Sequence, residues 1–128
     1  MLLALVASIL VGDSTCSTAR CTCRTTSDSA NTAWADVVFT AEVLLVAEQP
    51  DADRSFALVR VLSRLKGSIP DTVRVQTGLG GGDCGVLFAP GQPWTIYAQD
   101  RQGEWWTNIC VGTRPIGAPL PPARGPRR

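Results

Sequence analysis

The sequence contains no histidine, and this absence removes the side chain that most often serves as a general base and as a zinc ligand. The sequence also lacks an excess of charge of either sign, because its twelve basic and eleven acidic residues leave a net charge of only +1. Such a chain has no strong field that would attract a nucleic acid, an anionic membrane or an acidic substrate. We therefore expect neither an enzyme nor a nucleic-acid-binding protein, and no cofactor.

Long hydrophobic runs are lacking too. The apolar segment 1–11 is interrupted only by Ser8, and its length covers about half of a bilayer's hydrocarbon core, so a stable membrane span is not expected. It is more typical of a secretory signal, although no Lys or Arg precedes it. Ser17 and Ala19 fit a small-x-small cleavage pattern, which predicts removal of residues 1–19 and delivery outside the cell or into the cell envelope. A buried first strand is the alternative.

Cysteine is scarce, but its placement is informative. Of the five cysteines, Cys16 lies in the predicted signal and would leave with it. In an oxidising compartment the remaining four predict a disulfide framework. Cys21 and Cys23 are one residue apart, so a bond between them would close a strained ring. Each is expected to pair with Cys84 or Cys110, and the residues alone leave both arrangements open.

Alternating apolar and polar residues predict a mainly β protein. Ser27 or Asp28 is expected to cap a short helix that continues through Trp34. The strands expected after it are 36–48, 55–67, 71–77, 93–100 and 104–110, the last two forming a hairpin. The side chains expected to face the core are Val37, Phe39, Ala41, Val43, Leu45, Ala57, Val59, Val61, Leu65, Val73, Val75, Trp94, Ile96 and Ala98. About five or six short strands with one or two short helices predict a small closed or partly closed barrel.

The chain is expected to form one domain and to remain a monomer. Its 128 residues suffice for one modest hydrophobic core. We place the barrel at residues 20–114. Residues 115–128 are rich in Pro, Gly and Arg, which predicts a disordered tail, with a basic anchor as the alternative.

Two further patterns have ordinary structural explanations. The glycine-rich stretch 78–85 resembles a phosphate-binding loop, but no Lys-Ser/Thr pair and no helical pattern follow it, so we expect a flexible connection. The tryptophans could form a stacking platform for nucleic acid, which the near-neutral charge opposes. Trp94 is expected in the core. Strand alternation forces one of Trp105 and Trp106 outward, and we expect Trp106 inside and Trp105 exposed.

Several motifs occur in a recognisable order. The sequence shows Cys-x-Cys, a short helix, "ADVVFTAEV", Lys-Gly after the second strand, "CGVLF", "PGQPWTIYA" and a late Cys before "GTRP". This order resembles the netrin-like domain of the tissue inhibitors of metalloproteinases (TIMPs), and especially their bacterial secreted relatives, over residues 21–114. The resemblance implies a five-stranded OB-type barrel with disulfides joining Cys21 to Cys84 and Cys23 to Cys110. The third disulfide of the animal inhibitors has no counterpart here.

The resemblance also implies a function. In these inhibitors the first cysteine is the mature amino-terminus, and its α-amine and carbonyl chelate the zinc of a protease. Catalytic zinc keeps an open coordination position that such a pair of ligands can occupy. By position, Cys21 would chelate the partner's zinc and Thr22 would enter the specificity pocket beside it. The protease-binding residues implied by the resemblance are Cys21, Thr22, Cys23, Arg24, Asp83, Cys84 and Gly85.

Two hypotheses follow. The first is a secreted inhibitor of a zinc metalloendopeptidase, which requires processing after Arg20, because one extra residue converts the α-amine into an amide that binds metal poorly. The second is an extracellular interaction or structural module in which the disulfides only stabilise the fold. A cysteine-only zinc site is opposed by secretion and by the Cys-x-Cys spacing. A thiol–disulfide enzyme is opposed by the lack of groups, other than Arg20 and Arg24, that would stabilise a thiolate.

Overall fold

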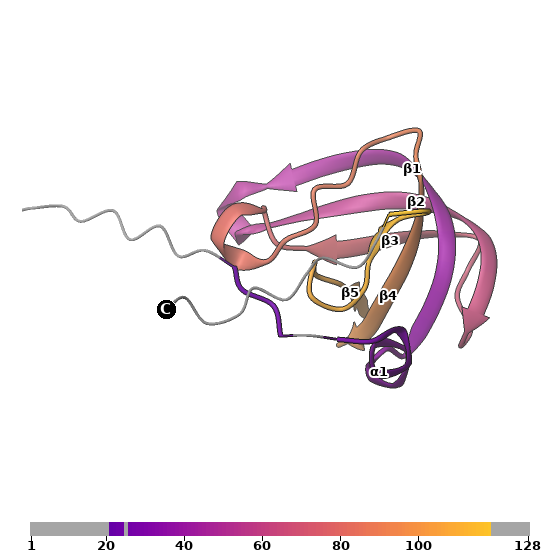
Figure 1. Ribbon diagram of the computed structural model, residues 1–128. Coiled ribbons are helices and arrows are strands. Elements are labelled where there is room, and N and C mark those ends of the chain that lie inside the picture. Colours follow the sequence, from indigo (N-terminus) through magenta and orange to yellow (C-terminus); the bar gives the residue numbers. More distant parts are fainter. Residues whose placement is uncertain (1–20, 25, 119–128) are drawn as a thin grey trace, which may run out of the picture.

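The computed structural model describes residues 21–24 and 26–118 (Figure 1). The helix and strands are α1 (Asp28–Trp34), β1 (Val37–Gln49), β2 (Arg54–Lys66), β3 (Thr72–Thr77), β4 (Pro93–Arg101), β5 (Glu104–Trp106) and β6 (Arg114–Pro115). Two short 3-10 helices, η1 (Pro50–Ala52) and η2 (Gly81–Asp83), lie between them. The predicted signal, its cleavage site and most of the predicted tail fall outside the described residues.

The sheet closes on itself as a barrel. Its strands follow the order β1-β2-β3-β5-β4, and an additional pairing of β4 with β1 completes the ring. All neighbours in this ring are antiparallel except β3 and β5, which run parallel. Figure 1 shows the long, curved β1 and β2 wrapping the barrel and α1 at one end. This is a closed form of the small, mainly β barrel that the strand pattern predicts, and it is the five-stranded OB-type barrel that the resemblance implies.

Local hydrogen bonds explain where α1 begins and what holds its end. The Ser27 hydroxyl accepts a hydrogen bond from the Ala30 N–H at 3.1 Å, which confirms Ser27 as the N-cap. After Trp34 the chain turns into β1. The Lys66 ammonium at the end of β2 donates to the carbonyls of Thr32 and Ala35, so a cation occupies the negative end of the helix. The helix is thereby fixed against the barrel end.

The barrel is filled by apolar side chains from every long strand. The buried cluster contains Val37, Phe39, Ala41, Val43, Ala57, Val59, Ile69, Val75, Val86, Phe88, Trp94, Ile96 and Ala98, with Val61, Val73, Trp105 and Ile109 packed against it. Apart from two leucines, the core side chains predicted from alternation therefore lie in the core. Apolar side chains therefore fill the interior of the barrel, as is usual for a barrel of this size.

The prediction that Leu45 and Leu65 face the core is wrong. Leu45 is 43% exposed and Leu65 is 64% exposed. The β1–β2 register shifts between Val43 and Leu45, and the extra residue moves Leu45 to the outer face. A second shift leaves Leu65 unpaired, because Arg64 and Lys66 take the flanking positions opposite β1. Each bulge interrupts the two-residue period on which the prediction rested.

The predicted orientation of the paired tryptophans is also wrong. Trp105 packs against the core, whereas Trp106 is half-buried outside it, with the Arg54 and Arg101 guanidinium carbons each 5.9 Å from its ring centroid. In the parallel β3–β5 pair, Trp105 lies opposite Val75, which is fully buried. The register therefore places Trp105 on the inner face and leaves Trp106 as the cation-stacked residue.

The end of the barrel extends slightly beyond the predicted boundary at residue 114. Pro115 pairs with Trp94 in β6, and the Ile116 N–H donates to the Pro93 carbonyl at 3.0 Å. The Arg114 side chain also donates to the Ala118 carbonyl at 3.1 Å. No helix among residues 21–24 and 26–118 is long and apolar enough to cross a membrane.

Candidate functional site

Two disulfides fix the amino-terminal segment 21–24 to one end of the barrel. Cys21 is bonded to Cys84, with their Cα atoms 5.0 Å apart, and Cys23 is bonded to Cys110, with their Cα atoms 5.1 Å apart. Both separations are ordinary for disulfides. The pairing that the resemblance implied is therefore confirmed. The segment itself belongs to no helix or strand, so the disulfides are its principal attachment to the fold.

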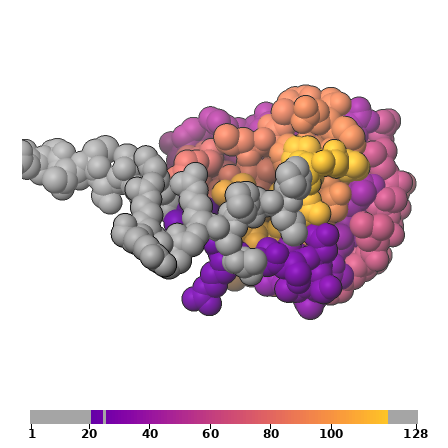
Figure 2. Space-filling model, in the orientation of Figure 1, coloured from indigo at the N-terminus to yellow at the C-terminus, as the bar shows by residue number. Residues whose placement is uncertain are grey.

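The side chains of the anchored segment alternate in exposure. Cys21 and Cys23 are half-buried, whereas Thr22 and Arg24 are exposed. The alternation follows from the bonding, because an extended chain with two cysteines turned toward the fold must turn the intervening residues outward. In the space-filling view, the indigo residues of this part of the chain and of α1 lie at the surface (Figure 2). Thr22 is thus available to contact a partner.

The loop that receives Cys21 is an ordered turn, which corrects the prediction of a flexible connection. The Asp83 carboxylate accepts hydrogen bonds from the N–H groups of Leu79, Gly80 and Gly85 at 2.7, 3.0 and 2.9 Å. Partial burial acts to raise the pKa of the Asp83 carboxyl, but these bonds outweigh it and hold the pKa below its ordinary value. Asp83 therefore organises the turn that positions Cys84.

Replacing Asp83 with asparagine is expected to cost about 1 kcal/mol of unfolding free energy near neutral pH, because a charge-assisted acceptor becomes a neutral one. Because the pKa of Asp83 is lowered in the folded state, its carboxylate stabilises the fold fully at pH values above the ordinary carboxyl pKa of about 4. This stabilisation is lost as the pH falls through the lower, folded-state pKa. Urea unfolding near pH 7 and near pH 2 measures the difference, with Asp51→Asn on η1 as the control for losing one carboxylate. An Asp83→Asn deficit that is the same at both pH values would contradict this role.

Gly85 is required because the backbone approaches it closely. A Cβ atom at Gly85 would lie 2.4 Å from the Gly78 carbonyl oxygen and 2.5 Å from the Gly80 nitrogen. Gly85→Ala is therefore expected to cost about 2–3 kcal/mol in unfolding free energy. Gly81→Ala is the matched control, since its Cβ meets nothing within 4 Å and only its φ of +78° is unfavourable, at about 1 kcal/mol. Equal losses in the two variants would contradict the steric explanation.

One backbone hydrogen bond joins the two loops that carry Cys84 and Cys110, and a side-chain bond fixes the turn at Cys110. The Ile109 N–H donates to the Cys84 carbonyl at 3.0 Å, and the Cys110 N–H donates to the Asn108 Oδ1 at 2.8 Å. Sequence analysis missed Asn108, although an Asn placed two residues before a turn N–H is a known signal for such a cap. The first bond holds the two cysteine-bearing loops together independently of the disulfides, and the second fixes the turn at Cys110.

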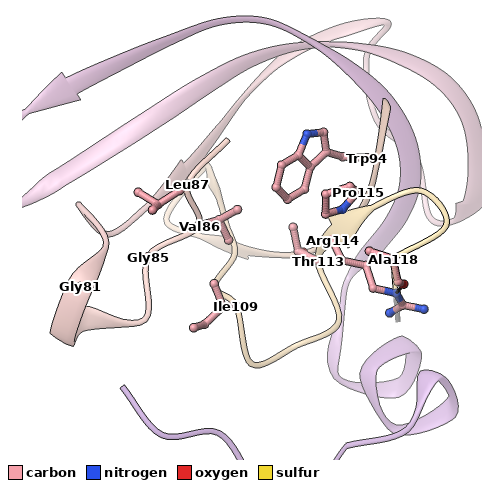
Figure 3. A pocket seen from close by; sticks show the side chains of 10 residues that line it. All are labelled: Gly81, Gly85, Val86, Leu87, Trp94, Ile109, Thr113, Arg114, Pro115 and Ala118. Carbon is pink, nitrogen blue, oxygen red and sulfur yellow. Dashed lines mark hydrogen bonds between the residues drawn. The ribbon is translucent and has the colours of Figure 1, made fainter. Parts of the chain in front are cut away.

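A cavity of about 480 Å³ lies beside the η2 loop. Its lining is mainly apolar and includes Val86, Leu87, Trp94 and Ile109 (Figure 3). Arg114 stands at its edge, but its guanidinium is 3.2 Å from the Asp28 carboxylate and is therefore already paired. The cavity offers space for apolar groups and no free charge to hold an anion.

The structure brings the predicted site residues together. Segment 21–24 and the turn 83–85 meet through the Cys21–Cys84 disulfide, and Cys23 reaches the second loop at Cys110. No protein-family model matches the chain, and no curated protein matches it. The fold and the site by themselves define the class of this protein, which is a small OB-type barrel whose amino-terminal segment is fixed to one barrel end by two disulfides.

Proposed function

We propose that this protein is a secreted, TIMP-like inhibitor of zinc metalloendopeptidases, carrying a netrin-like OB domain. The observation that supports this most directly is the anchored segment 21–24. It is held by a disulfide at each cysteine, and between and after these cysteines it presents exposed Thr22 and Arg24 side chains. A surface segment held in this way loses little conformational entropy when a partner binds it.

The proposed chemistry uses the backbone of Cys21. With Cys21 as the first residue, its neutral α-amine nitrogen and its carbonyl oxygen would coordinate the partner's zinc as a five-membered chelate. They would replace the water that the metal activates for peptide hydrolysis. Thr22 would then enter the pocket beside the metal, where its small hydroxyl side chain suits a shallow or polar site. The protease would be blocked without any reaction of the inhibitor itself.

Several expectations are part of the same proposal. Because the chain would act by presenting backbone ligands, it would need no cofactor and would have no catalytic residues of its own. It would act as a monomer outside the cell or in the cell envelope, where disulfides persist. Its partner would be a zinc metalloprotease. A module that binds another extracellular protein, without inhibition, is the alternative.

A competition assay tests the proposal. Protein that begins at Cys21, with both disulfides formed, is added to zinc endopeptidases of the metzincin and thermolysin classes in the presence of a fluorescent hydroxamate that binds the active-site zinc. We expect displacement of the hydroxamate from at least one enzyme, together with inhibition of peptide cleavage. Inhibition without hydroxamate displacement, or no inhibition of either class, would contradict zinc-directed binding and favour the interaction module.

Substitution of Thr22 tests whether its side chain enters the pocket. Thr22→Arg is expected to weaken inhibition of an enzyme with a shallow pocket by about tenfold or more, because a long charged side chain must be desolvated and accommodated. Ser29→Arg places the same side chain on the exposed surface of α1 and is expected to leave the inhibition constant unchanged. If both variants inhibit as well as the parent, Thr22 does not enter the pocket.

A further inference from the structure

The two disulfides meet at the sulfur of Cys110. The Cys110 Sγ is 3.8 Å from the Cys21 Sγ and also 3.8 Å from the Cys84 Sγ, although it is bonded to neither of them. These three sulfur atoms lie within 4.8 Å of one another. Both sulfurs of the first disulfide therefore contact one particular sulfur of the second.

The position of the fourth sulfur suits thiol–disulfide exchange at Cys110. In such an exchange a thiolate attacks one sulfur of a disulfide and expels the other. The sulfur that would be expelled belongs to Cys23, and it lies outside the group formed by the other three. The second disulfide thus presents its nearer sulfur, that of Cys110, to the first disulfide, and the leaving sulfur lies farther away.

Cys84, rather than Cys21, is held in place for this attack. The Ile109 N–H donates to the Cys84 carbonyl at 3.0 Å, so the loops of Cys84 and Cys110 stay together without any disulfide. Cys21 lies on the segment 21–24, which belongs to no helix or strand. Opening the first disulfide therefore lets Cys21 move away while Cys84 remains beside Cys110. Cys84 then has the higher effective concentration at the Cys110 sulfur.

We propose that reduction of the Cys21–Cys84 disulfide is followed by an internal exchange that forms a Cys84–Cys110 disulfide and releases Cys23. A small dithiol supplies the two electrons: it becomes a cyclic disulfide, and Cys21 and Cys84 each gain a hydrogen. The Cys84 thiol then loses its proton, and its thiolate attacks the Cys110 Sγ. The Cys23 sulfur leaves as a thiolate and takes up a proton. The protein ends with one disulfide and two more hydrogens than before.

The exchange detaches the whole segment 21–24 after the reduction of a single disulfide. The new bond joins two loops that already lie together, so the barrel needs little rearrangement. The four residues of the segment regain the conformational freedom that the two native disulfides had removed, which favours the exchange. A detached segment no longer presents Cys21 in a fixed position. The expected loss of inhibition rests on the proposed function, whereas the exchange itself does not.

Disulfide mapping after partial reduction tests the proposal. The full chain, carrying Cys16→Ser so that no fifth thiol takes part, is treated with limiting dithiothreitol, and free thiols are blocked with N-ethylmaleimide. Trypsin then places the four cysteines on three peptides: 21–24 with Cys21 and Cys23, 75–101 with Cys84, and 102–124 with Cys110. In chains with one disulfide left, we expect peptide 21–24 with both thiols blocked and the other two peptides linked. This form should exceed every other singly bridged form by about tenfold or more.

A variant that needs no reductant tests the same step. Cys21→Ser leaves Cys84 without its partner, and we expect the Cys84–Cys110 disulfide with Cys23 blocked by the maleimide. Cys84→Ser is the matched control, which is expected to keep Cys23–Cys110 and to show Cys21 blocked. Near-ultraviolet circular dichroism of the tryptophans shows whether each variant is folded. If Cys21→Ser does not fold, the partially reduced chain decides the question.

Three results would overturn the proposal. They are a Cys23–Cys110 disulfide that persists beside a free Cys84 thiol, a Cys21–Cys110 disulfide in the partially reduced chain, and loss of both disulfides without a singly bridged form. Inhibition is measured separately on the singly bridged chain. If the mapping shows the exchange but the native protein inhibits no zinc endopeptidase, the exchange stands and the proposed function fails.

Discussion

One residue added in front of Cys21 is expected to weaken inhibition of a sensitive zinc endopeptidase by about 1,000-fold or more, equivalent to about 4 kcal/mol of binding free energy. The extra residue turns the α-amine into an amide, whose nitrogen lone pair is delocalised and binds zinc poorly. It also adds bulk where the chelating group must approach the metal. The measurement compares inhibition constants for chains that begin at Arg20 and at Cys21.

The control for this comparison must preserve the fold. Both disulfides lie downstream of the added residue, so the two proteins are expected to share one thermal midpoint and one intact disulfide pattern. A chain that begins at Cys21 and carries one extra residue after Arg128 controls for length and should inhibit like the parent. If the chain that begins at Arg20 inhibits equally well, the α-amine is not a zinc ligand and the proposed mechanism is wrong.

Removal of the Cys23–Cys110 disulfide is expected to cost about 4–5 kcal/mol of unfolding free energy in the chain-entropy description. The bond links residues 87 apart in sequence, so its loss increases the conformational entropy of the unfolded chain. The Cys23→Ser/Cys110→Ser double variant keeps the Cys21–Cys84 disulfide and should unfold cooperatively at a much lower urea concentration. Urea unfolding of the oxidised proteins measures the difference.

Two comparisons make this prediction specific. Ser29→Ala, at an exposed position on α1, leaves both disulfides in place and is expected to match the parent. The Cys21→Ser/Cys84→Ser double variant, which opens a bond spanning 63 residues, is expected to lose slightly less than the first pair. If the unfolding free energy falls by less than about 1 kcal/mol in both double variants, neither disulfide is needed for the stability of the barrel.

The strand pattern was predictable because the barrel's inner face imposes a two-residue period on β1, β2 and β4. The prediction failed at Leu45 and Leu65 because a bulge adds a residue to one strand. Leucine occurs on both faces of this sheet, so the sequence does not show where such an extra residue lies. Trp105 and Trp106 were assigned in the wrong order for a related reason. Their orientation depends on a parallel pairing with β3, about 30 residues earlier in the chain, that local alternation does not reveal.

The site was predictable only in part. Cys-x-Cys spacing showed that Cys21 and Cys23 must find separate partners, but choosing between Cys84 and Cys110 required the resemblance to a known family. The glycine-rich stretch looked flexible because glycine broadens the accessible conformations. Its order comes from the three backbone bonds accepted by the Asp83 carboxylate, and the sequence does not show where that side chain points. The fold also brings the two disulfides into contact, with the Cys110 Sγ 3.8 Å from the Cys21 Sγ, and the sequence does not show this proximity.

The intact mass of the mature protein isolated from its native host, with and without reduction, tests the central claim most directly. The mass reports the first residue of the mature chain and the number of disulfides together. The inhibitor proposal predicts a chain that begins at Cys21 and gains four hydrogens on reduction, two for each disulfide. A mature chain that begins at Arg20 or earlier, with the same two disulfides, would lack the chelating amine and contradict zinc-directed inhibition.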